Sequence, residues 1–126
     1  MAKRAVGARL WVIPDGYLPE RSTGGMKSHE STCVLNLGAR PAVVKLTAYF
    51  EDREPLEGFR VACPPKRTIH IRLDRLKNHR QQSIPAGAPF ALKVESNRDI
   101  VVQHTRLDTT QPALALMTTM AFPAGR

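Results

Sequence analysis

Several polar residues in this sequence have side chains whose types and spacing could form a binding site. They are His29 with Glu30, His70 with Arg72, and His104 with Arg106 and Asp108. Residues two apart on a β-strand project from the same face, so His104, Arg106 and Asp108 are expected to point the same way. Such a face could bind a sugar or a small anion, or form a protein interface. The sequence contains no His-x-His, His-x-x-x-His or Cys-x-x-Cys pair to begin a zinc site, so we predict no metal and no cofactor.

The segment Val101-Val-Gln-His-Thr-Arg-Leu-Asp108 changes character along its length. On one face, Ile100 and Val102 are apolar, whereas the following same-face residues are polar and charged. This change indicates a strand that leaves the core and enters a cleft or a subunit interface. The alternative is an Arg106–Asp108 salt bridge in solvent, which would contribute little stability.

The motifs of the common catalytic sites are missing from the sequence. There is no Gly-x-Ser-x-Gly elbow, and Ser28 and His29 are neighbours that would face opposite sides of an extended chain. Gly24-Gly25 lacks the Lys-Ser/Thr of a phosphate-binding loop. Clustered carboxylates occur in the charged run Glu51-Asp-Arg-Glu54, which is typical of a hairpin end. We therefore predict that the protein is not an enzyme.

The chain is basic, with a formal net charge of +8, and this charge is densest between residues 66 and 80. A positive surface favours acidic partners such as nucleic acid, anionic lipid or an acidic protein. Aromatic residues, which single-strand binders use for stacking, do not occur in this stretch. A DNA-associated regulator and a solvated loop both remain possible interpretations. The candidate nucleic-acid or anion contacts are Lys66, Arg67, Arg75, Lys77 and Arg80.

The elements that must position these residues are strands, because the dominant period of the sequence is two. In 44–50, for example, Val44, Leu46 and Ala48 alternate with Lys45 and Thr47. Similar runs are expected at 10–13, 32–37, 59–63, 68–73, 90–95, 100–107 and 114–122. Turn signals separate them at Pro14-Asp-Gly16, Gly24-Gly25, Gly38-Ala-Arg-Pro41, Glu57-Gly58, Pro64-Pro65, Pro85-Ala-Gly87 and Asn97-Arg-Asp99.

This pattern predicts an all-β, antiparallel β-sandwich, Greek-key-like or jelly-roll-like, with about eight or more short strands and little helix. Residues 113–122 remain open between strand and helix, because Ala, Leu and Met favour a helix and the Thr118-Thr119 pair favours a strand.

The length of 126 residues fits one domain over 1–126, with flexible tails at 1–7 and 123–126. Cys33 and Cys63 lie in apolar runs and are expected to be small buried residues of a reducing compartment. No apolar stretch follows Lys3 and Arg4, and no run approaches the roughly 18 residues that span a bilayer. We therefore expect a cytoplasmic protein without direct membrane insertion.

Several strings in the sequence resemble the sensory rhodopsin transducer family. They are Trp11…Gly16-Tyr17…Pro19, Ser28-His-Glu-Ser-Thr-Cys-Val-Leu-Asn36, Tyr49-Phe-Glu-Asp-Arg-Glu-Pro55, Arg67-Thr-Ile-His-Ile-Arg72 and Val101-Val-Gln-His-Thr-Arg-Leu-Asp108. The resemblance covers about residues 10–121. Its polar motif positions, which the resemblance implies as ligand- or interface-binding residues, are His29, Glu30, His70, Arg72, Gln103, His104, Arg106 and Asp108.

This resemblance implies a small soluble β-sandwich that assembles as a tetramer and couples a membrane-embedded sensory rhodopsin to a cytoplasmic response. A similarity of the family to carbohydrate-binding sandwiches implies, as an alternative, a small-ligand protein that holds a sugar or an anion near His29, His70, Arg72, His104 and Arg106. The basic character of this chain departs from the family and implies that a protein partner would present an acidic surface. The expected function is a non-catalytic signalling module that relays the state of a partner.

Overall fold

The computed structural model describes residues 6–125, and these residues form an all-β structure. No helix occurs among them, and every pairing between strands is antiparallel. The strands are β1 (Ala8–Gly16), β2 (His29–Asn36), β3 (Ala42–Phe50), β4 (Leu56–Cys63), β5 (Arg67–Arg72), β6 (Phe90–Asp108), β7 (Ala115–Met120) and β8 (Phe122–Gly125). The predicted antiparallel all-β class is confirmed.

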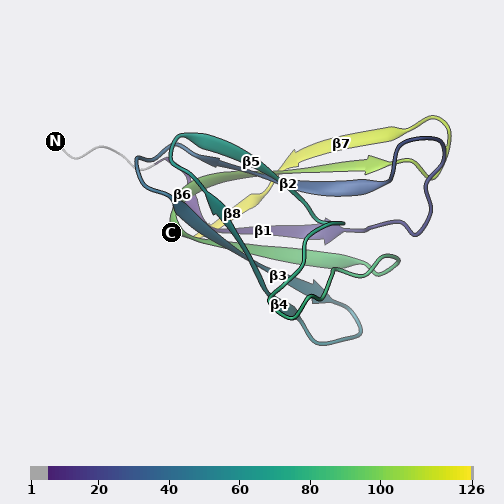
Figure 1. Ribbon diagram of the computed structural model, residues 1–126, viewed down its shortest axis with the longest axis horizontal. Coiled ribbons are helices and arrows are strands. Elements are labelled where there is room, and N and C mark those ends of the chain that lie inside the picture. The colour runs from purple at the N-terminus through teal and green to yellow at the C-terminus, as the bar shows by residue number, and fades with distance from the viewer. Residues whose placement is uncertain (1–5, 126) are drawn as a thin grey trace.

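Two sheets share the long strand β6 and form the two layers of a sandwich (Figure 1). Sheet A has the strand order β4-β3-β6-β1-β8, and sheet B has the order β5-β2-β6-β7. The first half of β6 pairs with β1 and β3, whereas its second half pairs with β2 and β7. The polar string near the end of β6 therefore lies in sheet B.

The continuity of β6 corrects one prediction. Asn97-Arg-Asp99 is typical of a turn, but the strand runs through it without a break. Polar side chains bind neighbouring segments here instead of closing a turn. Asn97 Oδ1 accepts a hydrogen bond from the Val43 N–H (2.8 Å), and Asp99 pairs with Arg9 (3.4 Å). The two strands expected on either side of this point are two halves of one strand.

The C-terminal segment is more ordered than the sequence indicated. Residues 115–120, which were open between strand and helix, form strand β7. Phe122–Gly125 forms β8 and pairs with β1, although a flexible tail was expected at 123–126. Between them, the buried Ala121 donates its N–H to Val102 O (3.1 Å), where the chain passes from sheet B to sheet A. Residues 1–5 and 126 of the expected tails lie outside the described residues.

The core between the sheets is built from the alternating residues that the sequence pattern identified. Val44, Leu46 and Ala48 are buried, whereas Lys45 is exposed. Trp11 lies in the core with its indole N–H donating to Ala8 O (3.0 Å) and Ile100 O (3.1 Å). Both cysteines are free thiols; Cys63 is buried as expected, and Cys33 is half-buried on the outer face of sheet B.

Two expected turns lie inside or at the end of strands, at irregularities in the register. Glu57-Gly58 belongs to β4, and Pro14-Asp-Gly16 forms the end of β1. Gly16 faces Phe90, and a Cβ at this position would overlap the buried aromatic ring. The absence of a side chain at Gly16 lets the chain pass close to β6 and sets the position of the following residue, Tyr17.

We expect Gly16→Ala to lower the free energy of unfolding by about 1–3 kcal/mol, because it overpacks the core against Phe90. Urea denaturation, followed by the fluorescence of the single tryptophan, measures this loss. Gly25→Ala is the matched control, since a Cβ there has no neighbouring atom within 4 Å. Equal denaturation midpoints for the two variants would contradict the close approach.

Candidate functional site

The register of sheet B divides the eight polar residues between two faces. Glu30 pairs with Arg106 and lies next to the Thr32–His104 pair, and these side chains point into the sandwich. The outer face carries His29, His70, Arg72 and Gln103. Asp108 lies at the end of β6, where its Oδ1 accepts hydrogen bonds from Thr110 N–H (2.8 Å) and Oγ1 (2.6 Å). The sheet lies between the two groups, so one small ligand cannot contact both.

Glu30 is the centre of the inward-facing group. Its side chain is 0% exposed, and its Oε1 accepts a hydrogen bond from His104 Nε2 (2.6 Å). Its Oε2 accepts from Arg106 Nε (2.8 Å) and from the backbone N–H of Tyr17 (2.7 Å). The Arg106 guanidinium also reaches Asp15 Oδ2 (3.4 Å) at the surface. Three donors thus surround a carboxylate that water does not reach.

These hydrogen bonds are required, because moving a carboxylate out of water is costly unless it is paired and fully bonded. The His104 ring is itself oriented by Thr32, whose Oγ1 lies 3.3 Å from Nδ1. The backbone carbonyl of Glu30 accepts from Leu73 N–H (2.9 Å), which ties the end of β5 to the same residue. One residue of β2 therefore connects the ends of β1, β5 and β6.

The hydrogen bonds to Glu30 explain why the end of β6 is polar, and this explanation differs from the one that the sequence indicated. The expected reason was a cleft or a subunit interface. The observed reason is a buried carboxylate on β2, which needs His104 and Arg106 as donors. The alternative of an Arg106–Asp108 salt bridge is not what the structure shows, since Arg106 pairs with Glu30 and Asp15.

Replacing Glu30 with Ala removes the acceptor and leaves an imidazole and a guanidinium without their partner inside the sandwich. We expect a loss of about 3–5 kcal/mol in the free energy of unfolding. Glu51→Gln, a change at an exposed carboxylate, is the control and should leave the midpoint of chemical denaturation unchanged. A Glu30→Ala midpoint within error of the control would show that the network does not stabilise the fold.

The outer face of sheet B is mixed in character. A shallow hollow of about 280 Å³ on this face is lined by Leu35, His70, Gln103 and Met120, among others. Cys33 lies in it between His70 on β5 and Gln103 on β6. Burial raises the pKa of the Cys33 thiol, so the thiol stays protonated at neutral pH. The face offers apolar contact and a few hydrogen-bonding groups rather than a catalytic centre.

Arg72 and His29, two of the predicted site residues on this face, already have partners. The Arg72 guanidinium holds Asp74 through two hydrogen bonds, of 2.8 and 2.9 Å, and Lys27 Nζ lies 3.5 Å from the same carboxylate. His29 Nδ1 bonds the carbonyl of Lys27 (2.9 Å). Burial acts to raise the pKa of Asp74, but the hydrogen bonds and charge of Arg72, with the charge of Lys27, lower it below the ordinary carboxylate value.

A carboxyl whose pKa is lowered by folding stabilises the protein above its unfolded pKa, near about 4, and loses that contribution as the pH falls. We therefore expect the free energy of unfolding of the wild type to drop as the pH decreases below about 4. Asp74→Asn should be less stable than the wild type at pH 7, and the difference should shrink on acidification. Denaturation at a series of pH values tests this. With Glu54→Gln as control, a difference that stays constant with pH would contradict the role of Asp74.

The basic residues at 66–80 do not form one patch. Lys66 lies in the turn before β5 and Arg67 is the first residue of β5, whereas Arg75, Lys77 and Arg80 lie in the loop after the strand. All five are exposed. The two groups are separated by the length of β5, so the stretch is continuous in sequence but divided in space.

Sequence reasoning missed three partners of the residues around Glu30: Asp15 at the surface, the Tyr17 N–H and Thr32. Asp15 lies in the expected turn Pro14-Asp-Gly16, and Tyr17 contributes a backbone N–H, which has no signature in sequence. Thr32 alternates with Glu30 along β2, so it could have been recognised as a neighbour on the same face.

The protein is a small antiparallel β-sandwich in which the inner face of sheet B carries the Glu30 network and the outer face is apolar and weakly polar. A sequence model of the family described as Anabaena sensory rhodopsin transducer matches residues 6–123. The chain therefore belongs to the sensory rhodopsin transducer family, and the predicted resemblance is confirmed. No curated protein matches the chain.

Solved structures similar to the protein include those of Thermotoga maritima 1070 and the Anabaena sensory rhodopsin transducer. The crystal structure of Thermotoga maritima 1070 is 38% identical, with 93% of this chain and 95% of that chain covered and a TM-score of 0.83. The Anabaena sensory rhodopsin transducer is 40% identical, with 83% of this chain and 92% of that chain covered and a TM-score of 0.74. Within residues 6–125, no helix is long and apolar enough to cross a membrane.

Proposed function

We propose that this protein is a non-catalytic signalling module of the cytoplasm, which forms a homotetramer and relays the state of a sensory rhodopsin or another acidic protein by direct contact. Membership of the transducer family supports the rhodopsin as partner. The net charge of +8 supports an acidic partner surface.

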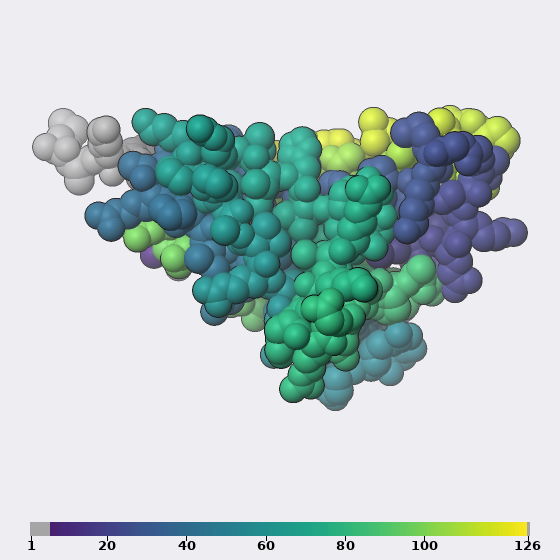
Figure 2. Space-filling view, in the orientation of Figure 1, coloured from purple at the N-terminus to yellow at the C-terminus, as the bar shows by residue number. Residues whose placement is uncertain are grey.

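The observation that carries the proposal is the exposed apolar surface of the C-terminal strands. Every residue of β7 and β8 is exposed. Leu116 is 69% exposed, Met120 57% and Phe122 64%. These strands are edges, because β7 pairs with β6 and β8 pairs with β1, with no further partner among the described strands. In the space-filling view, C-terminal residues (yellow) are visible along the right part of the upper margin of the molecule (Figure 2). Exposed apolar edge strands are typical of protein–protein contact sites.

The position of β7 gives a route by which contact could be relayed. Thr119 pairs with His104 across the β6–β7 ladder, and Met117 pairs with Arg106. A partner that adds to β7 therefore acts on the segment of β6 that holds Glu30. A partner can shift the protein between two states only by binding one state more tightly than the other. The exposed strand supplies the binding surface, and the buried network supplies an element sensitive to the position of β6.

The absence of catalysis is supported by where the acid–base groups lie. A histidine beside a carboxylate is the arrangement used in general acid–base catalysis, and His104 with Glu30 has this chemistry. His104 is 3% exposed and Glu30 is 0% exposed, so a substrate does not reach them. The pair acts as a structural tie.

The assembly part of the proposal predicts that Leu116→Ser with Met120→Ser lowers the oligomeric state, because it removes apolar area from the edge strand. Sedimentation velocity at micromolar concentration should show a tetramer for the wild type and smaller species for the double variant. Leu37→Ser is the control, since Leu37 is also exposed but lies in the loop after β2. A wild type that sediments as a monomer, or a double variant that remains tetrameric, would overturn assembly through β7.

The proposed binding to a rhodopsin is tested in a separate experiment. Biolayer interferometry measures the binding of the wild-type protein to a sensory rhodopsin in lipid nanodiscs. We expect saturable binding that weakens at high salt, because the complementary surfaces are charged. Absence of binding at tens of micromolar protein would exclude the rhodopsin as partner and leave the oligomer result unaffected.

A further inference from the structure

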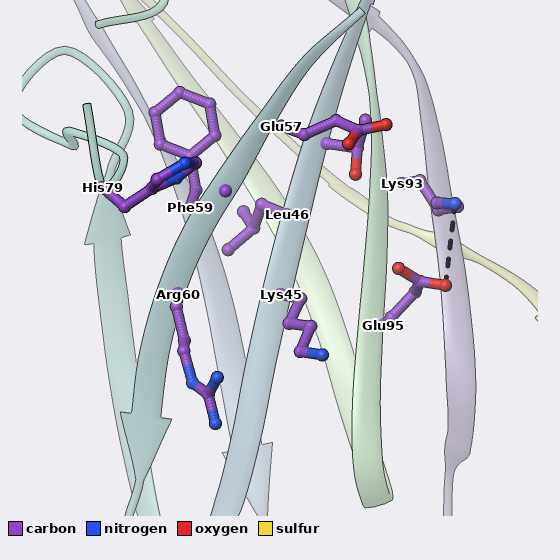
Figure 3. A pocket seen from close by; sticks show the side chains of 10 residues that line it. Lys45, Leu46, Glu57, Phe59, Arg60, His79, Lys93 and Glu95 are labelled. Carbon is purple, nitrogen blue, oxygen red and sulfur yellow. Dashed lines mark ion pairs between the residues drawn. The ribbon is translucent and has the colours of Figure 1, made fainter. Parts of the chain in front are cut away.

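A groove on the outer face of sheet A, away from the Glu30 network and from β7, contains cationic side chains that could bind an anion. It crosses β4, β3 and β6 and has a volume of about 450 Å³. Figure 3 shows the side chains that line this groove. A second hollow shares Lys45, Arg60 and Glu95 with it. A groove of this size suits a small organic molecule. Its polar lining residues are Lys45, Thr47, Glu57, Arg60, His79, Lys93 and Glu95, and Leu46, Gly58 and Phe59 line the rest.

Lys45 and Arg60 lie directly opposite each other in the β3–β4 ladder. Like charges in this position destabilise a sheet. Glu95 is the cross-strand neighbour of Lys45 on the other side, but its carboxylate pairs with Lys93 (3.6 Å). Among the described residues, no carboxylate lies within 4.0 Å of the Lys45 ammonium or the Arg60 guanidinium. Two adjacent cations therefore lack a protein counter-ion.

One wall of the groove is fixed in place by the loop between β5 and β6. The buried Asn78 donates a hydrogen bond to Glu57 O (2.8 Å) on β4 and accepts from the N–H groups of Arg80 (3.0 Å) and Gln82 (2.9 Å). This anchor places His79 directly over Gly58, where a Cβ would overlap the imidazole. In Figure 3 the His79 ring lies beside β4, at the end of the groove away from the Arg60 guanidinium. The hydrogen bonds of Asn78 thus hold the His79 side of the groove in place.

From this arrangement we propose that the groove binds a small phosphate monoester that carries hydroxyl groups. The phosphate lies between Lys45 and Arg60, because a guanidinium fork and an ammonium together match the charge and the oxygens of a phosphate dianion. The hydroxyl-bearing part extends towards Thr47, Glu57 and His79, whose side chains offer hydrogen-bond donors and acceptors. This site is independent of the proposed signalling function, since it lies on the other sheet from β7.

The test is isothermal titration calorimetry of the full chain with glycerol 3-phosphate and glucose 6-phosphate. Inorganic phosphate, glycerol and glucose serve as comparison ligands. We expect the esters to bind, inorganic phosphate to bind several-fold more weakly, and the two uncharged polyols to give no heat of binding. Lys45→Gln with Arg60→Gln should weaken the binding of the esters at least tenfold.

Arg75→Gln with Arg80→Gln is the matched control. It removes the same amount of charge from the exposed loop and should retain wild-type affinity. Equal losses in the two double variants would show non-specific attraction to a basic protein and overturn the site. Absence of ester binding would also overturn it, and inorganic phosphate binding as tightly as the esters would overturn the assignment of a phosphate ester. Circular dichroism and a wild-type unfolding midpoint for the Lys45/Arg60 variant establish that loss of binding is not loss of fold.

Discussion

A carboxylate inside a β-sandwich must collect its hydrogen bonds from the chain, and Glu30 imposes this requirement on the segments around it. His104 and Arg106 supply two donors from β6, and the Tyr17 N–H supplies a third from the end of β1. A slip of one residue between β2 and β6 would turn both side chains to the outer face and leave the carboxylate without them. The network therefore specifies the register of sheet B as well as stabilising it.

The same alternation that sends these charges inwards determines what the outside of sheet B can do. Gln103 and Thr105 alternate with the inward-facing donors His104 and Arg106, so they project outwards with Cys33 and Leu35 of β2. Charged groups that could serve on the outer face are already paired, as Arg72 is with Asp74. The surface that remains is apolar and weakly polar, which suits contact with another protein more than chemistry on a substrate.

Features that depend only on residues close together in the chain, such as strands and their buried faces, were predicted well from the sequence. Alternation in 44–50 identified Val44, Leu46 and Ala48 as buried, although Thr47 on the opposite face is buried as well. The polar string at 103–108 lies on a strand, as its alternation predicted. Its partner was not found, because Glu30 lies 74 residues from His104 and periodicity carries no information about which strands pair. Asn97-Arg-Asp99 was misjudged because residues that favour turns can also bind neighbouring segments within a strand. The facing of Lys45 and Arg60 likewise depends on the β3–β4 register.

Strand β6 belongs to both sheets, so it connects the surfaces to which we assign different roles. Lys93 and Glu95 line the groove on sheet A, and residues 103–108 carry β7 on sheet B. Two sites are coupled only if an element between them has two arrangements and each ligand binds one of these arrangements more tightly than the other. The coupling then acts equally in both directions. The Glu30 network holds the second half of β6 to β1 and β2, and two neighbouring strands hold the first half. Any such change must therefore be sought around residues 96–100, where β6 passes between the sheets and its pairing with β1 is irregular.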